Sequence, residues 1–500
     1  MSSFPGRRTR SGAEYSPFAN TVALRLADVH LANLLRHHDE GPDSDTESLN
    51  DSDADGDDDA APAQPFPRKP DIPPPRPSTF IRVAPPGHPP GTRLPNGLMP
   101  GSATAAEVKA RCLVKKHQRD RLTRSLKREQ LRTSAGCRLK HRLCQAAALQ
   151  LKATIADYAA PVAASGWQAI RQDELNARAH SLEEIQRERP DMLIYDWDGA
   201  PTPVIDADCN ILLLLGGFPP DDPTWSLEVA QDAAQQMEAA AIEIYSGPKW
   251  RRKAGLNGPA PRRGSHAAKH VGAAIGGGQR CYPMNLAHGA QNLLVFARLF
   301  GLKSFQRIAG WTNMLFMAFA PNLHEFYCTT YAALCDWDRL QACAKHIVRN
   351  FKGSASVFTT VTLNFGPITV TLPHIDFGNL AWGWCTVTAL GNFNPDRGGH
   401  LILWDLNLLI RFPPGSTILL PSAILRHSNL KISPNKTRFS FTQFTPAGIF
   451  RWVYNDFRTD KDINSAKSTM PEEHEQRKRD WASRWQEGIR MYRKWDGPVM

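Results

Sequence analysis

The feature that most constrains the fold is a series of short segments in which apolar and polar residues alternate. Gly, Pro or Asn separates one segment from the next. Because successive side chains of a strand point to opposite faces, this pattern predicts half-buried strands of an antiparallel sheet. The expected strands lie within residues 356–374, 383–393, 399–406, 416–428 and 437–444.

Helical patterns precede these strands. Residues 225–245 predict a helix, and further helical segments are expected at about 286–300 and 323–350. Between them, residues 249–280 are rich in Gly, Pro and positive charge and predict an irregular loop. Helices followed by a run of antiparallel strands indicate an α+β domain with a sandwich or small barrel.

The flanks of this domain differ from it in composition. Residues 1–105 carry an acidic run and then a proline-rich run, and they predict a long disordered tail because they bury too little apolar surface. Residues 106–155 predict a basic helical segment, which could grip phosphates, act as a nuclear import signal or be a solvated helix. The globular domain is expected over 156–460, and a C-terminal basic helix within 461–500.

Charge and cysteine content limit the class of protein. The formal net charge of +11 and a pI of about 9.2 favour a polyanionic partner such as nucleic acid. Nine cysteines without closely spaced pairs argue against a disulfide framework or a zinc module. The sequence shows neither a bilayer-spanning apolar run nor a secretory signal, so we expect a protein inside the cell without a membrane partner.

Three residues have the chemistry of a mononuclear iron site. Such an iron takes two histidines and one carboxylate on one side and keeps the other positions open. His374 and Asp376 are two residues apart on an extended strand, so their side chains point to the same face. His427, which closes a later strand-like run, supplies the third ligand. The spacing of the first pair alone has little specificity, since His37 and Asp39 in the tail share it.

A guanidinium and a hydroxyl follow in the next expected strand. Arg438 and Ser440 are again two residues apart and share a face. An arginine forms a bidentate, charge-assisted pair with a carboxylate, to which a serine hydroxyl can add a hydrogen bond. This pair suits the distal carboxylate of 2-oxoglutarate, whose other end would chelate the iron. The alternative interpretation is that these are surface histidines and a salt-bridged arginine.

The sequence around these residues resembles a known family. The resemblance is to the fungal TET/JBP-like dioxygenases that expanded alongside transposons in mushroom-forming fungi. It rests on NFGPITVTLPHIDFGNLAWGWCTVTALGNF, GGHLILWDLNLLIRFPPGSTILLPSAILRHSN and TRFSFTQFTPAGIFRWV, and upstream on GGGQRCYPMNL and AGWTNMLFMAFAPNLHEFY. It covers roughly residues 190–457, and this chain departs from the animal members in lacking their cysteine-rich zinc module.

The resemblance implies a fold and an activity. The fold is a double-stranded β-helix, a jelly-roll or cupin-like core with flanking helices. The activity is Fe(II)/2-oxoglutarate-dependent oxidation of 5-methylcytosine in DNA to 5-hydroxymethylcytosine and further products. By the family's pattern, His374, Asp376 and His427 are the catalytic iron ligands and Arg438 anchors 2-oxoglutarate. Fe(II), 2-oxoglutarate and O2 are thus the expected cofactors, methylated DNA the expected partner and the nucleus the expected location.

Contacts to the base are expected from polar residues near the iron ligands. A methyl group within a duplex is out of reach of a buried iron, so the target nucleotide should be flipped out of the stack. Asn379, Asn364 and His400 are candidates for touching the base or the cosubstrate. Each also has a structural interpretation, because an asparagine can cap a turn and His400 can simply start a strand.

Other functions fit part of this pattern. The chain could remove a methyl group from another base, such as N6-methyladenine. It could also be a catalytically inactive, transposon-associated DNA-binding protein that keeps the fold and the basic segments. A protein hydroxylase would use the same three ligands, and only the basic charge argues against it. The preferred base, its sequence context and the oligomeric state stay open at this point.

Overall fold

The computed structural model describes most of the predicted globular domain. The described residues are 7–8, 14–15, 143, 145–155, 158–172, 177–245, 264, 266–275, 282–341, 347–351, 355–465 and 471–500. Within the predicted disordered tail, β1 (Arg7–Arg8) pairs antiparallel with β2 (Glu14–Tyr15). The rest of that tail and most of the predicted basic helical segment lie outside the described residues. At the end of the basic segment the structure has a short strand, β3 (Leu149–Gln150), where the sequence predicts helix.

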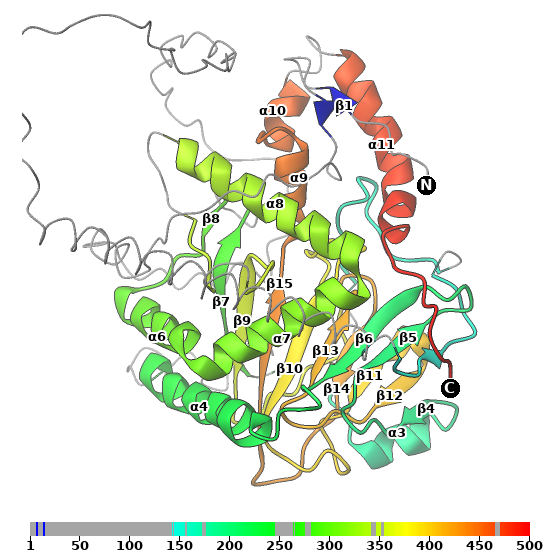
Figure 1. The fold of residues 1–500 in the computed structure, drawn as a ribbon, viewed down its shortest axis with the longest axis vertical. Coiled ribbons are helices and arrows are strands. Elements are labelled where there is room, and N and C mark those ends of the chain that lie inside the picture. Colours follow the sequence, from blue (N-terminus) through cyan, green and yellow to red (C-terminus); the bar gives the residue numbers. More distant parts are fainter. Residues whose placement is uncertain are drawn as a thin grey trace, which may run out of the picture. The chain divides into compact units, whose positions relative to one another are not determined.

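A nine-stranded sheet forms the largest layer of the described fold (Figure 1). All its neighbouring strands pair antiparallel except β3 and β5, which are parallel. The strands lie in the order β3, β5 (Thr202–Ile205), β6 (Ile211–Gly217), β13 (Thr417–Leu420), β10 (Cys385–Asn392), β15 (Thr437–Phe444), β9 (Thr360–Phe365), β7 (Ala267–Ala274) and β8 (Met284–Asn285).

A second sheet has four strands. Their order is β14 (His427–Asn429), β11 (Leu401–Leu403), β12 (Leu408–Ile410) and β4 (Leu193–Tyr195). The predicted strand at 416–428 is therefore divided, because β13 belongs to the large sheet and β14 to the small one. Pro421 follows β13 directly and has no N–H with which to extend its ladder. His427 thus begins a strand rather than closing one.

Helices cover one face of the large sheet (Figure 1). A π-helical segment, η3 (Trp225–Gln231), and α4 (Asp232–Tyr245) pack on β10, and α7 (Lys303–Phe319) packs on β6 and β13. Together, η3 and α4 confirm the helix that the sequence predicts over 225–245. The other helices are α3 (Leu182–Glu188), α6 (Ala290–Gly301), α8 (Pro321–Leu340), η4 (Trp404–Leu406), α9 (Ala447–Tyr454), α10 (Asp460–Ser465) and α11 (Pro471–Ile489).

Two elements differ from the sequence prediction. The sequence predicts no helix where α7 lies, and it predicts an irregular loop where β7 lies. The residues of β7, AAKHVGAA, do not alternate in polarity, and the strand is specified instead by its pairing with β9. At Gly272 in this strand φ is +127°, and a Cβ would lie 2.1 Å from the carbonyl oxygen of Thr359. Only glycine permits this close approach of the two chains.

The central strands of the large sheet have one face toward the helices and one toward a cavity. On the helix side, Phe441 of β15 packs edge-on against Phe305 of α7, with ring centroids 5.4 Å apart. The residues of β9 and β15 on this side are buried and are mostly apolar: Val361, Leu363, Phe365, Phe439, Phe441 and Gln443. The residues between them line the cavity and are mostly polar: Thr360, Thr362, Asn364, Arg438, Ser440, Thr442 and Phe444.

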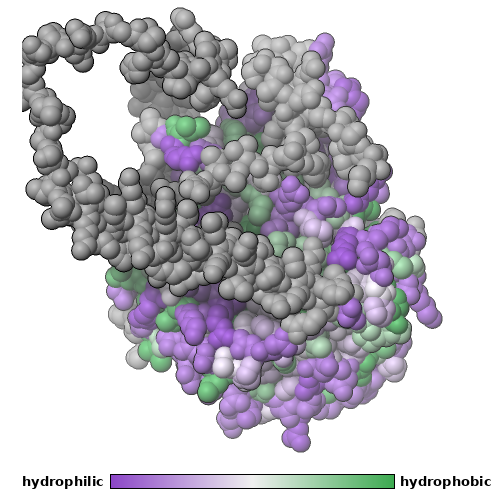
Figure 2. All heavy atoms as spheres, viewed as in Figure 1, coloured by the Kyte–Doolittle hydropathy of each residue, from purple (hydrophilic) through white to green (hydrophobic). Residues whose placement is uncertain are grey.

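The described fold is thus of the α+β class, as the sequence predicts. On the face shown in Figure 2, the described surface is largely hydrophilic, with hydrophobic patches that are small and separate. No described helix combines the length and the apolar character needed to cross a membrane.

Candidate metal centre and carboxylate pocket

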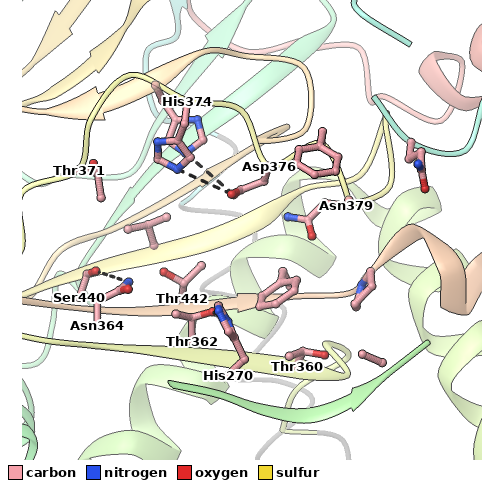
Figure 3. A pocket seen from close by; sticks show the side chains of 18 of the residues that line it. His270, Thr360, Thr362, Asn364, Thr371, His374, Asp376, Asn379, Ser440 and Thr442 are labelled. Carbon is pink, nitrogen blue, oxygen red and sulfur yellow. Dashed lines mark hydrogen bonds and ion pairs between the residues drawn. The ribbon is translucent and has the colours of Figure 1, made fainter. Parts of the chain in front are cut away.

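A cavity of about 210 Å³ lies between the two sheets of the described domain. Side chains from β7, β9 and β15 of the large sheet form one wall, and the segment around His374 faces them (Figure 3). Seven of the eight residues singled out in the sequence line this cavity: His374, Asp376, Asn379, Asn364, His427, Arg438 and Ser440. The sequence pattern therefore brings together residues that are up to 76 positions apart, as for Asn364 and Ser440.

Backbone hydrogen bonds fix the two histidines beside each other. The amide of His374 donates to the carbonyl of His427 at 3.0 Å, and the amide of His427 donates to the carbonyl of His374 at 2.9 Å. This exchange is the antiparallel bridge that joins the segment to β14. The two imidazole rings consequently lie with their centroids 4.4 Å apart.

Asp376 completes a three-ligand cluster. Its Oδ1 lies 3.7 Å from Nε2 of His374, and its Oδ2 lies 3.9 Å from Nε2 of His427. One potential ligand atom from each of the three residues lies within 4.8 Å of the others. The amide of Asp376 donates to the carbonyl of Ser422 at 2.9 Å, so the backbone position of the carboxylate is also fixed. The cluster could hold a metal ion.

The hydrogen bonds of the imidazoles determine which nitrogen faces the cluster. Nδ1 of His374 lies 2.7 Å from the carbonyl oxygen of Leu372, and Nδ1 of His427 lies 2.8 Å from that of Leu425. A carbonyl can only accept, so Nδ1 carries a proton in both rings, and Nε2 is the nitrogen that each ring turns toward Asp376. Metal-binding histidines are oriented in this way. Two imidazoles and one carboxylate are a set of donors that fits a divalent iron.

Arg438 is the buried cation of the cavity. It is 3% exposed, and its Nη1 donates to the carbonyl of Thr369 at 3.0 Å. Its Nε has no hydrogen-bond partner, and no carboxylate pairs with the guanidinium among the described residues. Burial lowers the pKa of Arg438 to about 10, so the side chain stays charged at neutral pH. A buried charge without a counter-ion is costly, and a carboxylate ligand would remove that cost.

Ser440 and Asn364 lie beside this cation on the same face of the sheet. They are paired across β15 and β9 in the strand register. Nδ2 of Asn364 donates to Oγ of Ser440 at 2.8 Å (Figure 3). Arg438 and Ser440 therefore offer a guanidinium and a hydroxyl to the same part of the cavity, as their spacing in the sequence predicts.

Asn379 and His400 have different positions. Asn379 lines the cavity and donates from Nδ2 to Oγ of Ser422 at 3.2 Å. His400 is buried just before β11 and is not among the residues that line the cavity. Burial lowers the pKa of His400 to about 4, so its ring is neutral. A contact from His400 to base or cosubstrate stays a prediction.

Some cavity residues escape sequence reasoning. His270 on β7 lies 2.7 Å, through its Nδ1, from Oγ1 of Thr362 on β9, opposite the metal cluster (Figure 3). It is missed because its strand falls in a stretch that predicts a loop. Thr371 is fixed by Oδ1 of Asn429, which accepts from its amide at 2.9 Å and its hydroxyl at 2.7 Å. The alternating threonines of β9 are the signal that could have indicated this polar wall.

Comparisons with known proteins add little to this geometry. No protein-family model matches the sequence, and no curated protein matches it. Among solved structures, the chain is similar to one described as NgTET1 in complex with 5mC DNA, at 14% sequence identity and a TM-score of 0.32. The match covers 51% of this chain and 83% of that one. A similarity at this level does not indicate function.

Proposed function

We propose that this chain is an Fe(II)/2-oxoglutarate-dependent dioxygenase. One observation carries the proposal: the same cavity contains a His-Asp-His cluster and, on its opposite wall, a buried arginine without a carboxylate partner among the described residues. A dicarboxylic keto acid would satisfy both at once. It would meet the metal with one end and the guanidinium with the other.

The residues of the site have separate tasks in this proposal. His374, Asp376 and His427 would hold the iron, and Arg438 with Ser440 would bind the distal carboxylate of 2-oxoglutarate. When bound, iron and cosubstrate supply the oxidising power, since decarboxylation to succinate is coupled to insertion of oxygen into a C–H bond. The protein's share is to orient the partners and to exclude water, and the burial of the two histidines serves this exclusion.

The core is proposed to be a double-stranded β-helix. Supporting this, β13, β10, β15 and β9 are adjacent in the large sheet. Facing them, the segment at His374 pairs with β14, which continues through β11 to β12. From β9 to β15 the chain crosses between these two sets of four at every step except one, the antiparallel pair β11 and β12 within the small sheet. Such alternation between two facing sheets is the connectivity of a jelly roll.

The proposed substrate is a methylated base in DNA, with 5-methylcytosine as the first candidate. The resemblance of residues 190–457 to TET/JBP-like dioxygenases and the net charge of +11 support this choice. The iron ligands are largely buried, so a base in a duplex would have to be flipped out to reach them. A nuclear location follows from this proposal and is part of it.

Nucleoside mass spectrometry tests the proposal. The chain is incubated with Fe(II), 2-oxoglutarate and duplexes that contain either 5-methylcytosine or N6-methyladenine, and succinate is measured in parallel. We expect 5-hydroxymethylcytosine, and none from the Asp376→Ala variant. Loss of the methyl group from adenine alone would change the assigned base. Succinate formation without any change in either base would refute the DNA substrate. A chain that binds DNA and iron but forms no succinate would refute the enzyme assignment.

A further inference from the structure

We propose that Asn364 is a positioning residue, which aims the hydroxyl proton of Ser440 at the carboxylate bound by Arg438. This inference deepens the proposed function and rests on it. It differs from the sequence-based expectation, in which Asn364 itself touches the base or the cosubstrate. The two roles differ in which of the two side chains donates in the hydrogen bond between them.

The direction of this hydrogen bond determines whether the hydroxyl proton of Ser440 is available to another acceptor. Nδ2 of Asn364 is 2.8 Å from Oγ of Ser440, and an amide nitrogen can only donate. A hydroxyl has one proton to donate and two lone pairs to accept with. Because one lone pair of Ser440 receives the amide proton, its own proton stays available for a different acceptor.

We expect the acceptor of the Ser440 hydroxyl proton to lie in the cavity. Ser440 lies within β15 between β10 and β9, so its backbone is paired on both sides. Its side chain lines the cavity on the same face as Arg438, two residues away. The described residues provide no acceptor for the hydroxyl proton within the sheet. A carboxylate held by Arg438 would be that acceptor.

The strand register makes Asn364 suited to this task. It lies directly opposite Ser440, at the last cavity-facing position of β9. Thr362, the next cavity-facing residue on the same strand, is opposite Thr442 and is bonded to His270. Thr362 therefore has a different partner, and among the described residues only Asn364 is hydrogen-bonded to the Ser440 hydroxyl.

Binding measurements on a double-mutant cycle test this role. 2-Oxoglutarate is titrated calorimetrically into the full chain loaded with Mn(II), which binds without turnover. Since a hydrogen bond to a charged group is at stake, Ser440→Ala and Asn364→Leu should each weaken binding by about tenfold. The double variant should bind as Ser440→Ala does, because Asn364 acts only through the serine. A product of the two single effects, or no effect of Asn364→Leu, overturns the inference.

Additional variants separate folding and ligand effects. Asn364→Asp is isosteric and can only accept, so it should take the serine proton and weaken binding at least as much as Asn364→Leu. Asn313→Leu is the matched control, because Asn313 lies on α7 outside the cavity, with its Oδ1 3.1 Å from Nε2 of His324, and its affinity for 2-oxoglutarate should stay unchanged. Unchanged Mn(II) affinity and unfolding temperature in the Asn364 variants show that metal site and fold are intact. Unchanged binding by Asn364→Asp contradicts the positioning role.

Arg438→Met distinguishes this inference from the proposed function. If 2-oxoglutarate affinity is lost in Arg438→Met but not in the Asn364 variants, only the positioning role fails. If Arg438→Met binds as well as the unsubstituted chain, the carboxylate pocket fails, and the proposed function fails with it.

Discussion

His374 and His427 exchange both of their backbone hydrogen bonds, at 3.0 and 2.9 Å, although 53 residues separate them in the sequence. The bridge holds their Cα atoms at the spacing of an antiparallel pair, and the carbonyls of Leu372 and Leu425 set the two ring orientations. The two ligands are therefore positioned by the fold itself. A metal would enter a site whose geometry is already formed.

Removing one imidazole should abolish metal binding without unfolding the chain. Loss of a hydrogen bond to a ligand already costs about 10- to 100-fold in metal affinity, so His374→Ala should cost more than about 100-fold. Iron content per chain after dialysis measures this effect. DNA affinity should persist, because the ligand lies inside the cavity.

His324 provides a matched control for this experiment. It is another buried histidine, with Nε2 3.1 Å from Oδ1 of Asn313, and it lies on α8 rather than in the cavity. The His324→Gln variant should keep its full iron content. Equal loss of iron in both variants would mean that general destabilisation, not ligand loss, explains the result.

Replacing Arg438 should abolish the effect of 2-oxoglutarate on stability. In the unsubstituted chain, 2-oxoglutarate at 100 times its Kd should add about 2.7 kcal/mol to the free energy of unfolding. Arg438→Met removes a buried charge that has no carboxylate partner among the described residues, so its stability without ligand should be equal or higher. Thermal unfolding with and without 2-oxoglutarate should then show a shift for the unsubstituted chain and none for the variant. A ligand shift that survives in Arg438→Met contradicts the assigned role.

Stability should fall in mild acid because of His324. Burial lowers the pKa of this histidine to about 4 from an ordinary value of 6.5. The unfolded chain therefore binds a proton more readily than the folded one, and stability is lost as pH falls from 6.5 toward 4. Between pH 7 and 5 this group alone should cost about 2 kcal/mol. Urea unfolding at the two pH values measures the loss of unfolding free energy, which should be smaller in His324→Gln than in the unsubstituted chain by that amount. An identical loss in both would show that His324 is not buried in its neutral form.

Gly272→Ala should destabilise the cavity wall. A Cβ there would lie 2.1 Å from the carbonyl oxygen of Thr359 and 2.8 Å from Nδ2 of Asn350, at a φ of +127°. We expect a loss of more than about 1 kcal/mol in the free energy of unfolding. Gly310→Ala is the control, since this glycine lies within α7 with nothing within 4 Å of a Cβ, and it should stabilise the chain by about 0.5–1 kcal/mol. Equal effects of the two substitutions would contradict the close packing of β7 on β9.

The strands and the ligand cluster could be predicted because their signals are local. The alternation in β10 and β15 indicates two faces directly, and a spacing of two residues puts Arg438 and Ser440 on one of them. Asp376 follows His374 at the same spacing. The third ligand has no such local signal. The chemistry requires a second histidine, and His427 is the histidine that the strand pattern places in a late strand.

The elements that could not be predicted depend on tertiary contacts. β7 is a strand because β9 offers it a paired edge, not because its residues favour a strand, so His270 stayed hidden in an expected loop. The division of residues 416–428 between two sheets also has no local periodic signal, apart from Pro421. Likewise, no described residue offers a carboxylate to the Arg438 guanidinium, and this is a property of the packed cavity that a linear pattern cannot show.

The alternation of helix-facing and cavity-facing residues along β9 and β15 affects which substitutions such a chain can accept. Positions that meet the helices and positions that meet the cavity occupy opposite sides of the same strands, so they can be exchanged independently of one another. Replacing Thr360, Thr362 or Thr442 alters the lining that a substrate encounters and leaves the apolar layer over α7 as it was. One scaffold can therefore acquire new substrate preferences through a few inward-facing side chains, while the His-Asp-His cluster and the folded core are retained.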